Sequence, residues 1–140
     1  MIPDDSRLDV LRKELIDQLT AGGYRIVAAK NTTGFQPPPA LKNDGYGDQK
    51  NKRPDIVALD PLNKFYIVGI VRTGDGDIES DESLTEYNVF LDQIDKTTRT
   101  PFRLWIIAPA KAADELTMLM TRYIHPDRIP QITIVKSSLG

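Results

Sequence analysis

The sequence predicts an α/β (α+β) protein in which a mixed central β-sheet is flanked by helices. Short runs rich in Val and Ile, which favour strands, alternate with longer segments whose apolar residues recur at helical spacing. One run, FRLWIIA at 102–108, is almost continuously apolar, as in a strand that is buried on both faces. The expected order of elements is α-β-β-β-α-β-α-β.

Length and composition are those of a soluble globular protein. The 140 residues fit one domain (1–140), and 40% of them are hydrophobic and 27% charged. A net charge of −2 gives no global argument for nucleic-acid binding, so any basic patch must be local. The absence of cysteine excludes disulfides, thiolate metal sites and cysteine nucleophiles. No signal-peptide pattern and no apolar run near the ~20 residues of a membrane span are present, so we expect a cytoplasmic location.

The first helix is expected over residues 4–21. Acidic and hydroxyl residues at its start suit a helix N-terminus, and Gly22-Gly23 supplies the break that ends it. Most of its polar side chains, Arg12 and Glu14 included, are assigned to the other faces of the helix. The apolar stripe consists of Leu8, Leu11, Leu15 and Leu19. The first strand follows at 24–29.

A β-hairpin is predicted from two apolar runs, 55–59 and 65–71. The five residues between them contain Pro and Asn, which favour a reversal of the chain. Asp55 stands at the mouth of the first strand, opposite the far end of the second. Because side chains alternate along a strand, Ile70 and Arg72 share one face at that end.

The second half of the chain predicts two more helices and a last strand. A helix is expected from about 84 to 95, where Ser83 and Glu86 match the S-x-x-E capping box. A third helix at 111–124 precedes a final strand at 131–136. His125, the only histidine, is expected to cap the end of the third helix. The apolar face of the second helix is Leu84, Tyr87, Leu91 and Ile94, and that of the third is Leu116, Leu119, Met120 and Tyr123.

The hairpin carries a resemblance to a known family. Pro54-Asp55, a hairpin and a second strand that ends in a basic residue resemble the core of the PD-(D/E)XK, or restriction-endonuclease-like, nuclease superfamily. The first six elements, residues 4–108, also follow that family's order. The resemblance implies that Asp55 and an acid on the second strand hold Mg²⁺, and that a Lys two residues later activates water. Those last two positions are Ile70 and Arg72. Asp55 therefore matches the family's pattern, Ile70 lacks the acid, and Arg72 keeps only the positive charge of the Lys.

An active enzyme would need an acid from elsewhere, because the second strand offers no carboxylate. Glu86, Asp75 and Asp77 are the candidates. Leu84–Asn88 is similar to the L-S-E-x-Q helix motif of replication-repair nucleases in the superfamily, and Asn88 takes the place of the Gln that lies near their active site. Glu14 has two interpretations. It is either a fourth acid near the metal, as the first helix supplies in some of these nucleases, or a solvated surface residue.

Residues 30–53 lack apolar periodicity and contain three consecutive prolines. Five bases stand against two acids in this segment, and Lys50, Lys52 and Arg53 directly precede the Pro-Asp pair. The resemblance implies that the loop approaches a nucleic-acid backbone, where Lys and Arg contact phosphates. The alternative is a solvated, partly disordered loop with no ligand. In both cases the composition predicts that the loop is mobile in the free protein.

Residues 74–86 contain six acids and no base. Their spacing resembles the liganding positions of a calcium loop, but Ser80 stands where that loop needs Gly, and a strand rather than a helix precedes it. The alternative is an acidic surface turn that leads into a capped helix. The residues at the liganding positions are Asp75, Asp77, Glu79, Asp81, Ser83 and Glu86.

Three functions follow from these observations. The first is a nuclease-like domain that has lost catalysis, needs no cofactor, and binds DNA, RNA or a partner protein. The second is a Mg²⁺-dependent nuclease that uses Asp55 as metal ligand together with a migrated acid. The third is a small regulatory or interaction domain, for example a homodimer, with no nucleic-acid partner. The candidate catalytic residues are Asp55, Arg72, Glu86 and Asn88.

Overall fold

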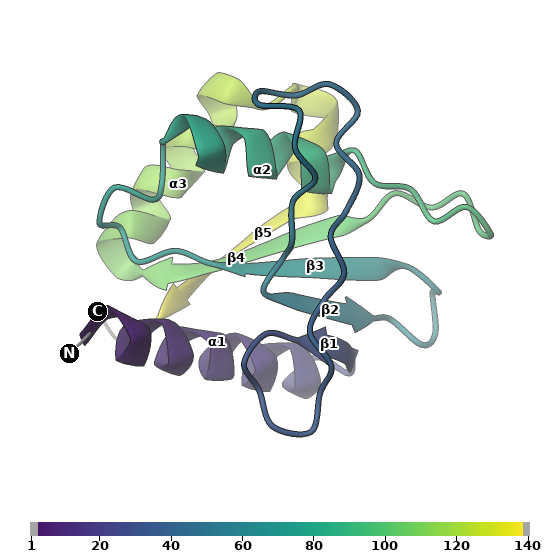
Figure 1. Ribbon diagram of the computed structural model, residues 1–140, viewed down its shortest axis with the longest axis horizontal. Coiled ribbons are helices and arrows are strands. Elements are labelled where there is room, and N and C mark those ends of the chain that lie inside the picture. Colours follow the sequence, from purple (N-terminus) through teal and green to yellow (C-terminus); the bar gives the residue numbers. More distant parts are fainter. Residues whose placement is uncertain (1–2, 139–140) are drawn as a thin grey trace.

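The middle of the molecule is one sheet of five strands: β1 (Arg25–Ala29), β2 (Ile56–Leu59), β3 (Tyr66–Val71), β4 (Arg103–Pro109) and β5 (Ile132–Ser137). It is seen in a computed structural model that describes residues 3–138 (Figure 1). The spatial order is β1-β2-β3-β4-β5. β2 pairs antiparallel with β1 and β3, whereas β4 pairs parallel with β3 and β5. The predicted mixed sheet is therefore confirmed.

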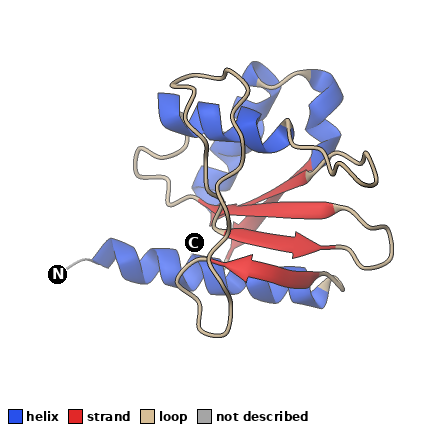
Figure 2. Ribbon diagram, turned by 45° about the vertical axis from the view of Figure 1, so that its right-hand side comes forward, coloured by secondary structure: helices blue, strands red, loops and turns tan. Residues whose placement is uncertain are grey.

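Helices cover both faces of this sheet. In the described part of the chain they are α1 (Pro3–Ala21), α2 (Asp81–Leu91), α3 (Ala110–Tyr123) and a short 3-10 helix, η1 (Pro126–Gln131). α1 lies on one face, and α2 and α3 lie on the other (Figures 1 and 2). α2 connects β3 to β4 and α3 connects β4 to β5, which is the connection that parallel neighbours require. Between residues 3 and 138 no helix is both long and apolar enough to cross a bilayer.

The side chains of β3 alternate between two apolar cores. Ile67 and Val71 pack with the leucines of α1, and Val68 and Ile70 pack with α2 and α3. Burying one such side chain stabilises the fold by about 1.5–3 kcal/mol. Gly69 lies on the α1 face, where an added Cβ would come within 3.1 Å of Leu15. The missing side chain thus lets α1 pack directly on the sheet.

The start of α2 differs from the prediction. Ser80, in extended conformation, caps the helix by accepting a hydrogen bond from the amide of Ser83, so the helix begins three residues before the expected position. Ser83 lies in the first turn and donates to the carbonyl of Asp77 at 2.6 Å. The predicted capping box of Ser83 and Glu86 is therefore wrong. Ser80 and Ser83 are both residue types that cap helices. Ser80 is the cap here because its backbone is extended, as an N-cap requires.

Two further expectations about helix ends were wrong. α2 ends at Leu91, so Ile94 no longer belongs to the helical face; it is 57% exposed and forms an isolated bridge with Pro101. His125 does not cap α3. Its Nδ1 accepts the amide of Asp127 at 3.1 Å and caps the start of η1, which the sequence did not predict.

The long loop between β1 and β2 is folded back on itself. Leu41 and Lys52 exchange backbone hydrogen bonds, so the two arms run side by side. The Asn43 side chain closes the tip by donating to the carbonyls of Tyr46 and Lys50. At the tip, Gly47 lies against α2. The mobility of residues 30–53 in the free protein stays a prediction.

The contact between the loop tip and α2 can be tested at Gly47. This residue has φ +50°, and an added Cβ would lie 2.0 Å from Oγ1 of Thr85. We expect Gly47→Ala to lower the free energy of unfolding by about 1–3 kcal/mol, as overpacking does. The Leu41 and Lys52 amides should also exchange faster with solvent, measured by NMR. Gly34→Ala is the control, because Gly34 also has positive φ but open space around it. Unchanged protection of both amides in Gly47→Ala would contradict the docking.

Candidate functional site

Asp55 lies at the end of the sheet where β2 begins and β3 ends. Its amide donates to the carbonyl of Gly69 at 3.0 Å, and its Oδ2 accepts the amide of Val71 at 2.9 Å. The carbonyl of Asp55 accepts the amide of Lys30, which follows β1, at 2.8 Å. Asp55 is thus tied to both neighbouring strands, as its predicted position at the mouth of the hairpin requires.

The Asp55 carboxylate faces a cavity of about 390 Å³ on the α1 side of the sheet. Arg12 lines this cavity and is buried, with its guanidinium paired to Asp9. Burial raises the pKa of Asp55, and the Val71 amide and the charges of Lys30, Arg72 and Arg12 act against that rise. The remaining lining residues are Leu8, Asp9, Lys30, Asn31 and Val71.

The Arg72 side chain points to the other layer. Its amide continues the pairing of β3 with β4 by donating to the carbonyl of Ile107 at 2.9 Å. Its Nη2 lies 2.5 Å from Oε1 of Glu86 on α2, and its Nε donates to the hydroxyl of Tyr87 at 3.2 Å. The guanidinium carbon also lies 5.2 Å from the centre of the Tyr87 ring, within cation–π range. Arg72 is therefore held by two consecutive residues of α2.

Tyr87 completes this polar cluster. Its hydroxyl donates to the carbonyl of Ile78 at 2.8 Å while it accepts from Arg72. Burial raises the pKa of the phenol, so Tyr87 stays neutral and keeps its proton for that bond. Burial alone would lower the pKa of Arg72, but Tyr87 and Glu86 raise it above its ordinary value. The hydrogen bonds of Arg72 with Glu86 and Tyr87 thus offset the cost of burying these polar groups beneath the surface.

The predicted catalytic group is divided between two layers. Ile70 and Arg72 share the α2 side, as predicted, and Ile70 is 2% exposed within the core of that side. Asp55 instead lines the cavity against α1. Ile70 presents only hydrocarbon, so no second carboxylate on β3 accompanies Asp55.

The residues present do not fit a magnesium or calcium site. Glu86 is paired with Arg72, Asp75 with Arg7, and Asp77 accepts the amides of Thr73 and Gly74. In the part of the chain that the structure describes, no three His, Cys, Asp or Glu side chains gather where they could hold a metal ion. A protein site for either ion normally needs several oxygen ligands, so the acids of 74–86 do not form the calcium loop that was considered.

The hydrogen-bond partners of Asn88 and Glu14 are residues other than Asp55 and Arg72. Asn88 donates to the carbonyl of Leu84 at 3.0 Å and lines a separate cavity beneath the loop tip. Glu14 is neither a metal ligand nor a free surface residue. It accepts hydrogen bonds from the hydroxyl of Ser137 and the amide of Ser138, so it joins α1 to the end of β5.

The three predicted phosphate-binding residues have different environments. Lys50 and Arg53 are exposed. Lys52 is 6% exposed, and its Nζ lies 2.8 Å from Oδ2 of Asp48. That hydrogen bond lowers the pKa of Asp48 and raises that of Lys52. The charge of Lys52 is therefore directed inward, and of the three predicted residues only Lys50 and Arg53 are exposed to solvent.

Arg12 and Tyr87 belong to the site but were not predicted to. Arg12 was grouped with the polar residues expected mostly on faces other than the apolar stripe, and it is 6% exposed. Its position four residues after Leu8, on the edge of the apolar stripe, was a usable signal. Tyr87 was expected only as an apolar core residue, and nothing in its spacing marks the hydroxyl as a partner of Arg72.

Comparison of the chain with known families, proteins and structures found no significant match. No family model matches the chain, and neither a curated protein nor a solved structure gives a significant match.

The charge of Glu86 should be important for stability. Glu86→Gln leaves the guanidinium of Arg72 buried without its carboxylate, because the two side chains are only 10% and 18% exposed. We expect the free energy of unfolding to fall by about 3 kcal/mol, measured by urea denaturation. Glu82→Gln, an exposed change on the same helix, should alter it by no more than about 0.5 kcal/mol. Equal effects of the two changes would contradict the importance of the pair.

Asp55 should make stability depend on pH. Its folded-state pKa is raised, so the folded protein binds the proton more tightly and stability falls as pH rises from the unfolded value of about 3.9 through the folded pKa. Asp55→Asn keeps an oxygen for the Val71 amide and removes the buried charge. We expect the variant to be more stable than the parent at pH 7 and the difference to vanish below about pH 4. Denaturation across this pH range measures it, and a variant less stable at pH 7 would refute the prediction.

Proposed function

We propose that the chain is a non-catalytic domain of restriction-endonuclease-like fold that binds nucleic acid through its phosphates. The order of elements from α1 to β4, an antiparallel hairpin followed by a helix and a parallel strand, supports the fold proposal. The position of Asp55 at the mouth of that hairpin supports it as well.

The observation that carries the loss of catalysis is the buried pair of Arg72 and Glu86. Glu86 is one of the three acids considered as a replacement for the carboxylate missing at Ile70, and its Oε1 lies 2.5 Å from Nη2 of Arg72. Arg72 stays protonated and so cannot take a proton from water, as a neutral Lys would. The described residues offer no cluster of metal ligands, and Arg72 offers no base, so this end of the sheet lacks the two usual sources of assistance to phosphodiester cleavage.

The exposed bases of the loop support phosphate binding. Lys30 begins the loop, Arg53 ends it two residues before Asp55, and Lys50 lies nearby on the second arm. Within residues 3–138 none of the three side chains makes a hydrogen bond or an ion pair. Lys30 and Arg53 flank the Asp55 end of the sheet from the two arms, because the amide of Lys30 bonds to the carbonyl of Asp55. Such bases contact phosphates without reading sequence.

We expect binding to depend on salt and on these three bases. Fluorescence anisotropy with labelled duplex DNA of about 20 base pairs, between about 50 and 200 mM salt, should show a log–log slope near −2.7 if three phosphates are contacted. The triple variant Lys30→Ala, Lys50→Ala, Arg53→Ala should weaken binding about tenfold or more at low salt. The control removes the exposed bases Arg25, Lys96 and Lys111, which lie outside the loop, and equalises net charge.

Three results would count against the proposal. The first is an absence of binding to DNA and RNA at low salt. The second is an equal loss of binding in the triple variant and its control. The third is Mg²⁺-dependent cleavage by the unmodified chain that disappears in Asp55→Ala. That outcome would show that the domain is an enzyme despite its occupied Glu86.

A further inference from the structure

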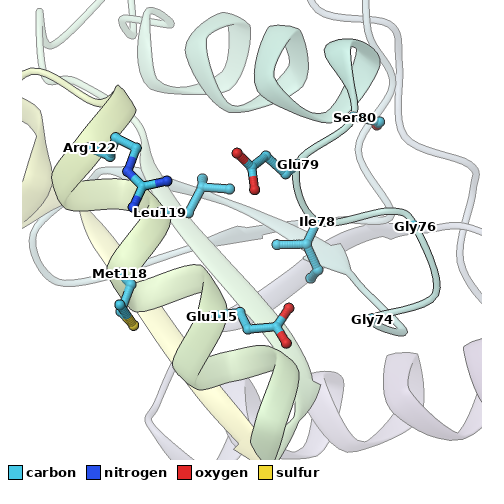
Figure 3. A pocket seen from close by; sticks show the side chains of 9 residues that line it. All are labelled: Gly74, Gly76, Ile78, Glu79, Ser80, Glu115, Met118, Leu119 and Arg122. Carbon is cyan, nitrogen blue, oxygen red and sulfur yellow. The ribbon is translucent and has the colours of Figure 1, made fainter.

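A groove runs between α3 and the turn that follows β3. It encloses about 430 Å³ (Figure 3). Ile78 and Leu119 form its floor, and Met118 stands at its rim on α3. Ile78 and Leu119 belong to the core, with 6% and 5% exposed, whereas Met118 is 68% exposed. Leaving a Met side chain in water forgoes stabilisation that a partner's apolar side chain would recover.

The turn that forms one wall of the groove is held in place. Asp77 accepts the amides of Thr73 and Gly74, and its own carbonyl accepts the hydroxyl of Ser83 at 2.6 Å. Gly74 has φ +92°, and a Cβ there would lie 3.0 Å from the Cβ of Ala112, so the turn presses against the start of α3. A wall fixed in this way costs little ordering entropy when a ligand binds.

The groove is also negatively charged. Glu79 and Glu115 project into it from the turn and from α3 (Figure 3). Glu79 is fixed further by the hydroxyl of Tyr123 at 3.0 Å. The exposed acids Asp81 and Glu82 follow next along the chain. The one base among the residues that line this groove is Arg122, so carboxylates outnumber bases around an apolar floor.

We propose that this groove binds a basic segment of a partner protein. An apolar side chain of that segment enters between Ile78, Met118 and Leu119, and a neighbouring Lys or Arg pairs with Glu79 or Glu115. Charge complementarity selects this occupant, because a nucleic acid or an acidic peptide would be repelled by the same carboxylates. The proposal goes beyond phosphate binding by the loop, and either one can fail without the other.

The test is an NMR titration with the blocked peptide acetyl-Lys-Leu-Lys-Leu-Lys-amide. We expect shift changes at the amides of Gly74 and Gly76 and at the methyl group of Met118. Met118→Ser, Glu79→Gln and Glu115→Gln should each weaken binding by about threefold. Asp17→Asn, an exposed change on α1, is the matched control for charge. The same peptide with Gly in place of Leu, and one with Glu in place of Lys, should bind at least about threefold more weakly.

Three outcomes would overturn the proposal. One is the absence of shift changes at the groove. Another is binding that Met118→Ser leaves intact and that Asp17→Asn weakens as much as Glu115→Gln does, which would indicate non-specific attraction to acids. The third is concentration-dependent slowing of tumbling without peptide, with the same Gly74 and Met118 signals affected. That result would identify a second copy of this chain as the occupant.

Discussion

Arg72 places a positive charge in the apolar layer between β3 and α2, where its side chain is 10% exposed. Such a charge is unfavourable by several kcal/mol unless its hydrogen bonds are made, and a guanidinium cannot escape by losing its proton. α2 therefore has to present both Glu86 and Tyr87 to the end of β3, which fixes the rotation of the helix and its position along its axis. Tyr87 also fixes the turn between β3 and α2, because its hydroxyl donates to the carbonyl of Ile78.

The end of the sheet thus carries a charged group on each side. Asp55 lies toward α1 with Arg12 and Lys30 around it, and Arg72 lies toward α2 with Glu86. In a metal-dependent nuclease the carboxylates of this region would converge on one cation. Here Arg72 neutralises Glu86, whereas burial raises the pKa of Asp55 in spite of the positive charges around it. The charged groups at this end of the sheet therefore face two different layers.

The strands and helices could be predicted because they depend on apolar periodicity, which is local. Leu11, Leu15 and Leu19 are fully buried as their spacing predicts, and the strand pairing follows the two hairpin runs. The polar residues were harder, because their burial depends on contacts distant in sequence. Lys52 turns inward and its Nζ donates to Asp48. Glu86 is beyond the capping position because α2 begins at Asp81, and it pairs with Arg72 instead. Asp55 faces the layer of α1, and residue spacing near position 55 cannot predict this, because α1 is distant in sequence.

The bonds from Glu14 to Ser137 and Ser138 have a consequence for the order in which the protein can fold. The carboxylate of Glu14 and the amide of Ser138 are 124 positions apart, so α1 and the end of β5 meet only after the strands between them have been made. During synthesis the leucine face of α1 emerges before the strands that cover it. Contacts between such distant segments form slowly, because the intervening chain must be ordered before they can. We therefore expect α1 to reach its final position late, with its apolar face available to chaperones until then.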